Sequence, residues 1–585
     1  MTLLGVIWIA PLFSQNNAGA DETFLGVGSG SRTIAKAQKT AISPSQIDST
    51  LQMDEVKYYL EPKQQEVSYE IENITPAKLK IVEPLDRLYS GYLKAGAGMY
   101  LTPFVDLNYS SKRSKYESWG VKGNYQSSFG NIKEMGNTKF SDLNFGGYYQ
   151  KFFMNYDLWS EVQYERNSYQ FYGLDYNDNS MYQFYGIDIT DSLGIESFKN
   201  SDTLFKQNYD LLDLHVKFNS RNTGRDTNKL RIKSWVDFHH LNSNYNLSEN
   251  HFLLGAHSGW LILDEEFLGT FELDINNVSS PDILELDENN IIQPSNQSSN
   301  TSGIVRFRPH IYSRKNNLIF KAGISLQANI NENAKFYVFP DLEVSYSLFN
   351  NVFIPYGGWV GNVQRNTFND IRLENPYISE DATLQNTVQK SNIFVGVRGS
   401  LSSKFTFNLS SSFKSLDSMY FFVPDTTSSY GNKFQMMYDN LSQTSFLAEL
   451  TYQELEKLKI SAKGEYFIYS PSNFSRAWQK PEFILTLSSI LDLSDKIVLK
   501  SDFYLVGKRE VFSYSEPESI YELEDDKFIY SLPTFVDMNI SAEYRYNNKV
   551  SAFIQFNNFT AKKYQYWQNF PVQSINILGG ITISF

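Results

Sequence analysis

Hydrophobic and polar positions alternate along the last stretch of the chain, residues 573–585. Every second position on one side of this stretch is apolar, except for a single glycine: Ile577, Gly579, Ile581, Ile583 and Phe585. The other side is small or polar apart from Leu578, and a period of two is that of a β-strand with one apolar face. A terminal strand of a soluble domain usually frays, whereas the strand that closes a membrane barrel is paired on both edges. We therefore predict that residues 573–585 close a transmembrane β-barrel.

The same alternation recurs upstream from Gly91. In residues 318–330, seven apolar side chains share one face, and Lys, Gly, Ser, Gln and Asn share the other; residues 458–468 and 537–546 repeat the pattern. These strands exceed the five or six residues typical of soluble strands, and no helical stretch is predicted between them. Closure into a cylinder protects every strand edge. The expected fold class is all-β: a large antiparallel transmembrane β-barrel over residues 90–585.

The lengths of the connections support closure. The short turns fall at 111–114, 315–316, 350–351, 402–403, 455–456, 493–495 and 547–548, and the long connections at 172–204, 278–299, 365–388, 423–432, 471–480, 510–533 and 559–572. Short turns at one end and long loops at the other are typical of outer-membrane barrels, although the connections near Ser243 and Asn331 are short on the long side. The count is about 22 strands, the first near Tyr92. An even count places both termini on one side, expected to be the periplasm.

The residues before the barrel have a different character. Residues 1–14 are predicted to be a signal peptide, because the apolar run within them is too short to span a bilayer. No Lys or Arg precedes that run, which leaves open a start codon further upstream. Residues 15–89 are weakly patterned and rich in Lys, Gln, Ser and Pro, so we expect a periplasmic tail that is partly disordered. Two roles stay open for this tail: docking on a partner or entering the lumen, or serving as a flexible leader.

Composition narrows the class of protein. The mean hydropathy is -0.38, and no run of about 18 apolar residues occurs, which argues against a helical membrane protein. Aromatic residues make up 16% of the chain, which suits the girdles of a barrel at the membrane interfaces. The net charge of -13 argues against nucleic-acid binding, and the absence of cysteine excludes disulfides and thiolate metal sites.

The candidate chemistry is sparse. No HExxH or GxSxG motif and no phosphate-binding glycine loop occurs, and neighbouring His239 and His240 point to opposite faces of a strand, which makes a poor chelate. We therefore predict no catalytic residue, no cofactor and no metal site. Two acidic loops, residues 516–526 and 282–288, have the oxygen ligands that Ca²⁺ prefers, but without a spaced Asp-x-Asp-x-Asp-Gly loop a solvated acidic face is favoured.

Charged residues at the polar positions of the strands are expected to face the lumen, because a charge facing lipid costs about 2–4 kcal/mol at mid-membrane. These residues are Arg231, Lys233, Arg306, Arg308, Asp341, Glu343, Lys459, Lys463, Asp537, Glu543 and Arg545. Pairing between neighbouring strands is the favoured interpretation of this mixed wall, and selection of solutes is the alternative.

The last hairpin, FIQFNNFTAKKYQYWQNFPVQSINILGGITISF, resembles that of TonB-dependent receptor barrels. The matching positions are Asn557, Asn558, Phe559, Lys562, Lys563, Tyr564, Pro571 and Phe585. The stretches YSGYLKAGAGMYLTPFVDLNYSS and GGWVGNVQRNTFNDIRLENPYIS resemble plugless TonB-dependent-receptor-like barrels of Bacteroidota. The resemblance covers roughly residues 67–585. It specifies a barrel family and no ligand, and neither a plug domain nor a TonB-contact segment is recognised.

The resemblance implies an outer-membrane barrel that passes or binds solutes. The alternative is a non-transporting scaffold subunit of a protein-assembly or surface-secretion complex; a barrel-embedded enzyme is disfavoured. The expected partners are outer-membrane lipids, lipopolysaccharide, and proteins bound through the 15–89 tail or the long outer loops. Because lumen width grows with strand number, an unplugged barrel of this size needs loops, the tail or a partner to fill it.

Overall fold

A computed structural model describes residues 89–585 except for 202–204, 221–230, 263–264, 281–283, 287–291, 295–298, 332–333, 455–456 and 513–528. The predicted signal peptide and nearly all of the predicted tail lie outside the described residues, as do most of the two acidic loops. Among the described residues, no helix has the length and apolarity needed to cross a membrane.

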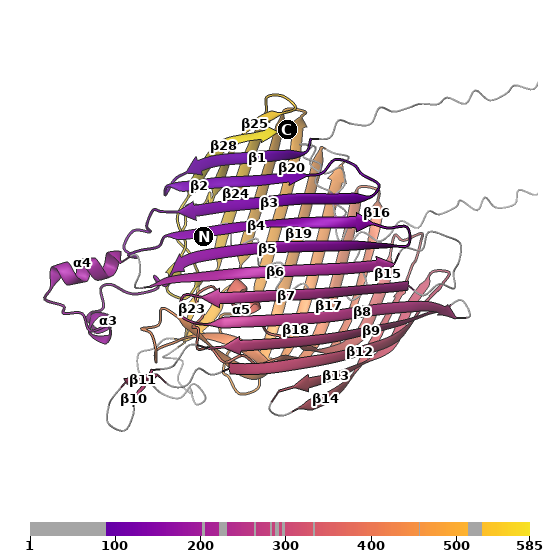
Figure 1. Cartoon of the computed structure of the whole chain (residues 1–585), viewed down its shortest axis with the longest axis horizontal. Coiled ribbons are helices and arrows are strands. Elements are labelled where there is room, and N and C mark those ends of the chain that lie inside the picture. The colour runs from indigo at the N-terminus through magenta and orange to yellow at the C-terminus, as the bar shows by residue number, and fades with distance from the viewer. Residues whose placement is uncertain are drawn as a thin grey trace, which may run out of the picture.

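Twenty-two strands form one closed antiparallel sheet (Figure 1). They are β1 (Gly91–Gly98), β2 (Thr102–Ser110), β3 (Glu117–Ser128), β4 (Phe140–Phe152), β5 (Tyr156–Gln170), β6 (Lys206–Ser220), β7 (Arg231–Ser243), β8 (Ser248–Ile262), β9 (Glu265–Ser279), β12 (Ser299–Lys315), β13 (Leu318–Ile330), β14 (Lys335–Tyr346), β15 (Ile354–Gln364), β16 (Thr387–Ser402), β17 (Phe405–Pro424), β18 (Phe434–Glu454), β19 (Leu458–Pro471), β20 (Phe483–Ser494), β21 (Ile497–Val506), β24 (Phe535–Arg545), β25 (Val550–Asn557) and β28 (Asn576–Ser584). Each strand pairs with the next, and β28 returns to β1. The predicted fold class and strand count are confirmed.

The seam between the first and last strands is continuous. The register of β1 and β28 runs from Tyr92↔Ser584 to Gly98↔Leu578. The Phe585 backbone N–H donates to the Gly91 carbonyl at 2.9 Å, and its ring stacks on Tyr109 with the ring centroids 6.1 Å apart. The last residue therefore lies against the start of the first strand.

Most connection lengths alternate around the barrel as predicted. Residues 316–317, 403–404 and 495–496 are short turns at the end where both termini of the sheet lie, called here the turn end. The connections β5–β6 and β15–β16 lie at the opposite end, called here the loop end. The β1–β2 connection, residues 99–101, is a further short one at the loop end.

Short elements, none of them predicted from the sequence, lie within the connections of the loop end. They are the helices α3 (Asn179–Phe184), α4 (Ser192–Asn200) and α5 (Phe368–Glu374), and the hairpins β10 (Leu284–Leu286) with β11 (Ile292–Pro294), β22 (Arg509–Phe512) with β23 (Ile529–Leu532), and β26 (Gln565–Trp567) with β27 (Phe570–Pro571). Each helix starts at a capping side chain, as where the Thr367 hydroxyl accepts from the Asp370 N–H. The helices were missed because six to nine residues are too few for a clear 3.6-residue period.

Candidate functional site: a segment folded into the barrel mouth

The β15–β16 connection, residues 365–386, crosses the barrel mouth and is called here the in-folded segment. It begins at Arg365, whose guanidinium donates from Nε to Asp274 Oδ1 at 2.9 Å and from Nη1 to Ser302 Oγ at 2.5 Å. Asp274 lies on β9 and Ser302 on β12, which are not neighbours of β15 in the sheet. The segment therefore leaves its own strand and lies against the inner face of the barrel.

The first turn of α5 is held by a buried carboxylate on β8. The Glu249 side chain is fully buried and accepts hydrogen bonds from the backbone N–H groups of Phe368 at 2.8 Å and Asn369 at 2.9 Å. The same carboxylate accepts from Asn276 at 2.8 Å and lies 3.3 Å from His239 Nε2. An acid at a helix N-terminus is favourable because the first N–H groups of the helix lack partners within it.

Asp274 forms a second cluster of ionic contacts, next to the Glu249 carboxylate. Its carboxylate lies 3.1 Å from Arg306 Nη1 and 3.1 Å from His251 Nε2, in addition to Arg365. The His239 and His251 rings are 4.9 Å apart, so the two carboxylates belong to one continuous network. Separating a buried charge from its partners is strongly destabilising. This network therefore favours one position for the start of the in-folded segment.

The end of α5 reaches other strands. Arg372 donates to Asn167 of β5 at 2.9 Å, and its guanidinium lies 5.1 Å from the ring centroid of Tyr209 of β6. Glu374 accepts from Tyr420 of β17 at 2.5 Å and from Lys480 at 3.0 Å. Because β5 and β17 lie about half the sheet apart, the helix bridges opposite walls of the barrel.

An aromatic layer covers this bridge. Tyr377 stacks on Phe570 with ring centroids 3.5 Å apart, and Ile378 forms a backbone bridge with Phe434 at the start of β18. The buried residues of the layer come from all sides of the loop end: Ile132, Phe140, Tyr169, Phe171, Tyr172, Tyr209, Leu211, Leu241, Leu247, Phe368, Ile371, Tyr377, Ile378, Ala382, Tyr420, Phe422, Phe434, Met436, Trp567 and Phe570. The main hydrophobic core of the described barrel therefore closes one mouth. The in-folded segment and this layer together are called here the lid.

Two buried carboxyl groups of the in-folded segment should each favour its docked position more strongly as pH falls. Burial raises the pKa of the Asp370 carboxyl on α5, with Glu249 adding to the rise and Thr367 opposing it. Burial likewise raises the pKa of Glu380, against the effect of Lys433. A raised pKa means that the docked segment binds protons more tightly than the released one, so this stability is complete below the ordinary carboxyl pKa of about 4 and is lost as pH rises through the raised value.

The measurement is hydrogen exchange at residues 366–386 between pH 4 and pH 8, corrected for intrinsic rates. We expect protection to fall with rising pH in the natural protein. The Asp370→Asn variant carries a permanently neutral side chain and should show a flatter profile, whereas an unchanged profile would mean that Asp370 does not set the dependence.

The predicted lumen charges lie in polar pairs, most of them between strands, or beside such pairs. Arg308 lies 2.7 Å from Glu272, and Lys321 lies 2.7 Å from Asp341 and 3.4 Å from Glu343. Arg231 pairs with Glu266 at 2.7 Å and Arg545 with Asp492 at 3.5 Å, in each case on another strand. Lys463 pairs with Glu465 of its own strand at 3.2 Å, and Asp537 accepts from Tyr564 of the β25–β28 connection at 2.8 Å. The remaining predicted charges lie two or four residues from these, on the same strands: Lys233 beside Arg231, Lys459 near Lys463, and Glu543 beside Arg545.

Sequence reasoning did not find the residues that fasten the lid. Glu249 and Asp274 occupy polar positions of alternating strands, so the signal used for Arg306 was present for them as well. Arg365, Arg372 and Glu374 lie in a long connection, where no periodicity marks their partners. Within the described ranges, no group of three or more His, Asp or Glu side chains is placed to hold a metal ion.

The fold defines a class: large closed antiparallel barrels of the kind that form outer-membrane receptors. Over 85% of this chain, the structure is similar to the siderophore receptor PirA from Acinetobacter baumannii, with a TM-score of 0.61, 9% identity and 80% of that chain covered. It is also similar to the ferripyoverdine receptor of the outer membrane of Pseudomonas aeruginosa, with a TM-score of 0.61, 12% identity, 85% of this chain and 72% of that chain covered. At such identities the likeness concerns the fold alone. No protein-family model and no curated protein matches the sequence.

Proposed function

We propose that this chain is an outer-membrane β-barrel of the TonB-dependent-receptor-like type, without a plug domain, that binds or passes a solute. In this proposal the outer face contacts outer-membrane lipids and lipopolysaccharide, the turn end and both termini are periplasmic, and the loop end faces outward. The resemblance to Bacteroidota barrels and the receptor fold of the structural neighbours support this assignment.

The in-folded segment carries the proposal. Its contacts with Asp274, Glu249, Asn167 and Tyr420 fasten it across the mouth in one position. These contacts are hydrogen bonds and ion pairs between polar groups, which water can replace when the segment leaves. The segment also buries apolar side chains in the lid. A barrel whose mouth is closed by its own loop, held partly by exchangeable polar contacts and partly by this packing, is suited to admitting a solute when the loop moves.

Removal of the segment tests this function. Gln364 and Thr387 are direct register partners of β15 and β16, so an Asn-Gly turn can join the two strands in place of residues 365–386. In planar bilayers we expect the natural barrel to be nearly silent and the shortened barrel to form stable open channels. Liposome swelling with uncharged sugars of increasing size then gives the width of the opened path.

A second candidate function is a scaffold subunit of a larger outer-membrane complex, and the α3–α4 connection favours it. This arm projects from the loop end of the barrel (Figure 1) and exposes Phe184, Ile189 and Leu193, the last with 78% of its side chain exposed. Replacing residues 174–200 with a Gly-Ser linker is the matched control, because it shortens a loop outside the lid and should leave the barrel silent. A barrel that stays silent without residues 365–386, and loses co-purifying proteins without the arm, would favour the scaffold.

A further inference from the structure

The barrel wall contains a split between β14 and β15. On one edge, β14 pairs with β13 from Leu318↔Tyr346 to Asn329↔Lys335. On its other edge, it pairs with β15 only from Ser345↔Tyr356 to Asp341↔Val360. Residues 335–340 of β14 therefore have a neighbouring strand on one side, and no described strand pairs with them on the other.

The sequence explains where the split begins. Asp341 is the last residue of β14 that pairs with β15, and its neighbour Pro340, on the unpaired side, has no N–H to donate to a ladder. On the facing strand, the β15–β16 register shifts between Val360 and Asn362, where Gly361 of β15 faces two residues of β16, Lys390 and Ser391. This bulge of β16 disrupts the ladder and increases the local twist of the pair. A Cβ at Gly361 would lie 2.7 Å from the Phe339 ring, which shows how closely β15 passes.

Beyond the bulge, β15 is held away from β14 by other partners. The Val363 backbone N–H donates to the Gln327 side chain at 2.8 Å, and the Val363 carbonyl accepts from Arg306 at 3.1 Å. The Val363 side chain is fully buried with Ile304, Phe339 and Val388. These contacts belong to the inner face of β12 and β13, so the end of β15 lies inside the barrel, where it leads into the in-folded segment.

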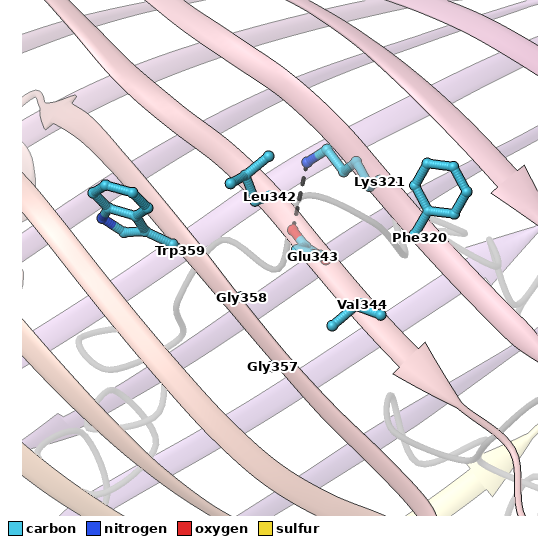
Figure 2. A pocket seen from close by; sticks show the side chains of 8 residues that line it. All are labelled: Phe320, Lys321, Leu342, Glu343, Val344, Gly357, Gly358 and Trp359. Carbon is cyan, nitrogen blue, oxygen red and sulfur yellow. Dashed lines mark hydrogen bonds and ion pairs between the residues drawn. The ribbon is translucent and has the colours of Figure 1, made fainter.

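The free edge is unusually exposed and apolar. Phe336 and Val338 are 67% and 59% exposed, more than any other large hydrophobic residue within a described strand. Farther along β14, where it pairs with β15, a shallow recess of about 350 Å³ lies over Gly357 and Gly358 (Figure 2). Its apolar side chains are Phe320, Leu342, Val344 and Trp359, while Lys321 and Glu343 form their ion pair in the same view.

We propose that residues 335–340 of β14 are a docking edge for an apolar β-strand of a different polypeptide, not a second copy of this chain, in the same membrane. In apolar surroundings, the unpaired N–H and C=O groups of an edge need backbone partners, and an extended strand supplies them whereas a lipid acyl chain does not. Strand addition to a free edge is a general mode of recognition. Phe336 and Val338 continue the apolar outer face of β13 at Ala328 and Leu326, so the added strand must itself be apolar on that face.

The predicted tail joins the barrel far from this edge. It enters the barrel at β1, at the turn end, and β1 lies about half the sheet away from β14. The free edge lies toward the loop end, on the outer side of the inward-bent β15. The inference rests on the membrane location in the proposed function, but strand docking requires neither solute passage nor movement of the lid.

Disulfide capture tests the docking edge, because the chain has no cysteine of its own. The probe is a synthetic peptide with the sequence of residues 324–330, the segment that already pairs with the other edge of β14, flanked by lysines and carrying one cysteine in place of Leu326. The barrel carries Val338→Cys. The control is Val395→Cys on the outer face of β16, which is 55% exposed on a strand paired along both edges.

We expect the peptide to couple at least tenfold faster to Val338→Cys than to Val395→Cys in lipid nanodiscs. A peptide with the same side chains, N-methylated at alternate amides, cannot form the ladder and should lose this preference. Equal rates at both sites, or full coupling of the methylated peptide, would mean simple apolar adhesion and would overturn the proposal.

Two further outcomes would also overturn it. A disulfide between Val338→Cys and Asn362→Cys in the double variant without peptide would show that β15 itself returns to the edge. A dimer linked through two copies of Val338→Cys would make the occupant a second copy of this barrel.

Discussion

Glu249→Ala is expected to release the start of the in-folded segment from the barrel wall. The substitution leaves the Phe368 and Asn369 N–H groups and the Asn276 side chain without their acceptor, at a site with no exposed surface. Removing one member of a buried, hydrogen-bonded charged cluster typically costs about 3–5 kcal/mol. At roughly tenfold per 1.4 kcal/mol, this predicts a rise of about a hundredfold to a few thousandfold in the released population.

Hydrogen exchange of residues 366–375 measures that population directly. Glu343→Ala is the matched control, since it removes a glutamate from a partly exposed pair with Lys321, away from the lid, and pairs of that kind contribute only about 0.2–1 kcal/mol. Bilayer recordings of the Glu249→Ala barrel should show brief openings that the control lacks. Unchanged exchange of α5 in Glu249→Ala would contradict the role assigned to this carboxylate.

Gly580→Ala is expected to prevent the barrel from closing. Gly580 and Gly96 face each other across the β1–β28 seam. A Cβ at Gly580 would lie 2.1 Å from the Ala95 carbonyl oxygen and 2.6 Å from the Gly96 Cα, and both of these atoms belong to the backbone. Backbone atoms of a paired strand cannot move aside without breaking the ladder, so the cost should reach or exceed the upper end of the usual overpacking range, about 3 kcal/mol.

Adjacent Gly579 provides the control for this prediction. A Cβ there comes no closer than 3.7 Å to its nearest neighbour, an ordinary contact, so Gly579→Ala should close normally. The readout is the heat-dependent shift of a folded barrel on a denaturing gel, lost in Gly580→Ala and kept in Gly579→Ala. A normal shift in both variants would show that the seam tolerates a side chain at Gly580.

The sequence predicted those features of the fold that repeat. Alternation along each strand, together with the spacing of the turns, led to the closed barrel, the 22 strands and the position of the closing strand. Each of these depends on a local period, which is visible wherever one face meets lipid and the other does not. Leu578, the one apolar residue on the polar side of the last strand, is buried at the seam, where its side chain lies against Gly98.

The lid could not be predicted in the same way. Its contacts join residues more than a hundred positions apart, such as Glu249 with Phe368 or Tyr172 with Pro571, and no local period records such a pairing. The split beside β14 also escaped prediction, although one of its local causes, Pro340, is visible in the sequence. A proline within an alternating stretch is a reason to expect an edge, and here the edge lies inside a sheet that is otherwise closed.

The seam between β1 and β28 also constrains how this protein folds. Tyr92 and Ser584 are register partners at opposite ends of the described chain. One edge of the first strand therefore stays unpaired until the last strand has formed. Contacts this distant in sequence form late and slowly, and an open edge attracts wrong strands during the delay. Correct assembly in the cell therefore requires factors that shield the waiting β1, and loss of those factors should trap the chain as an unclosed, aggregation-prone sheet.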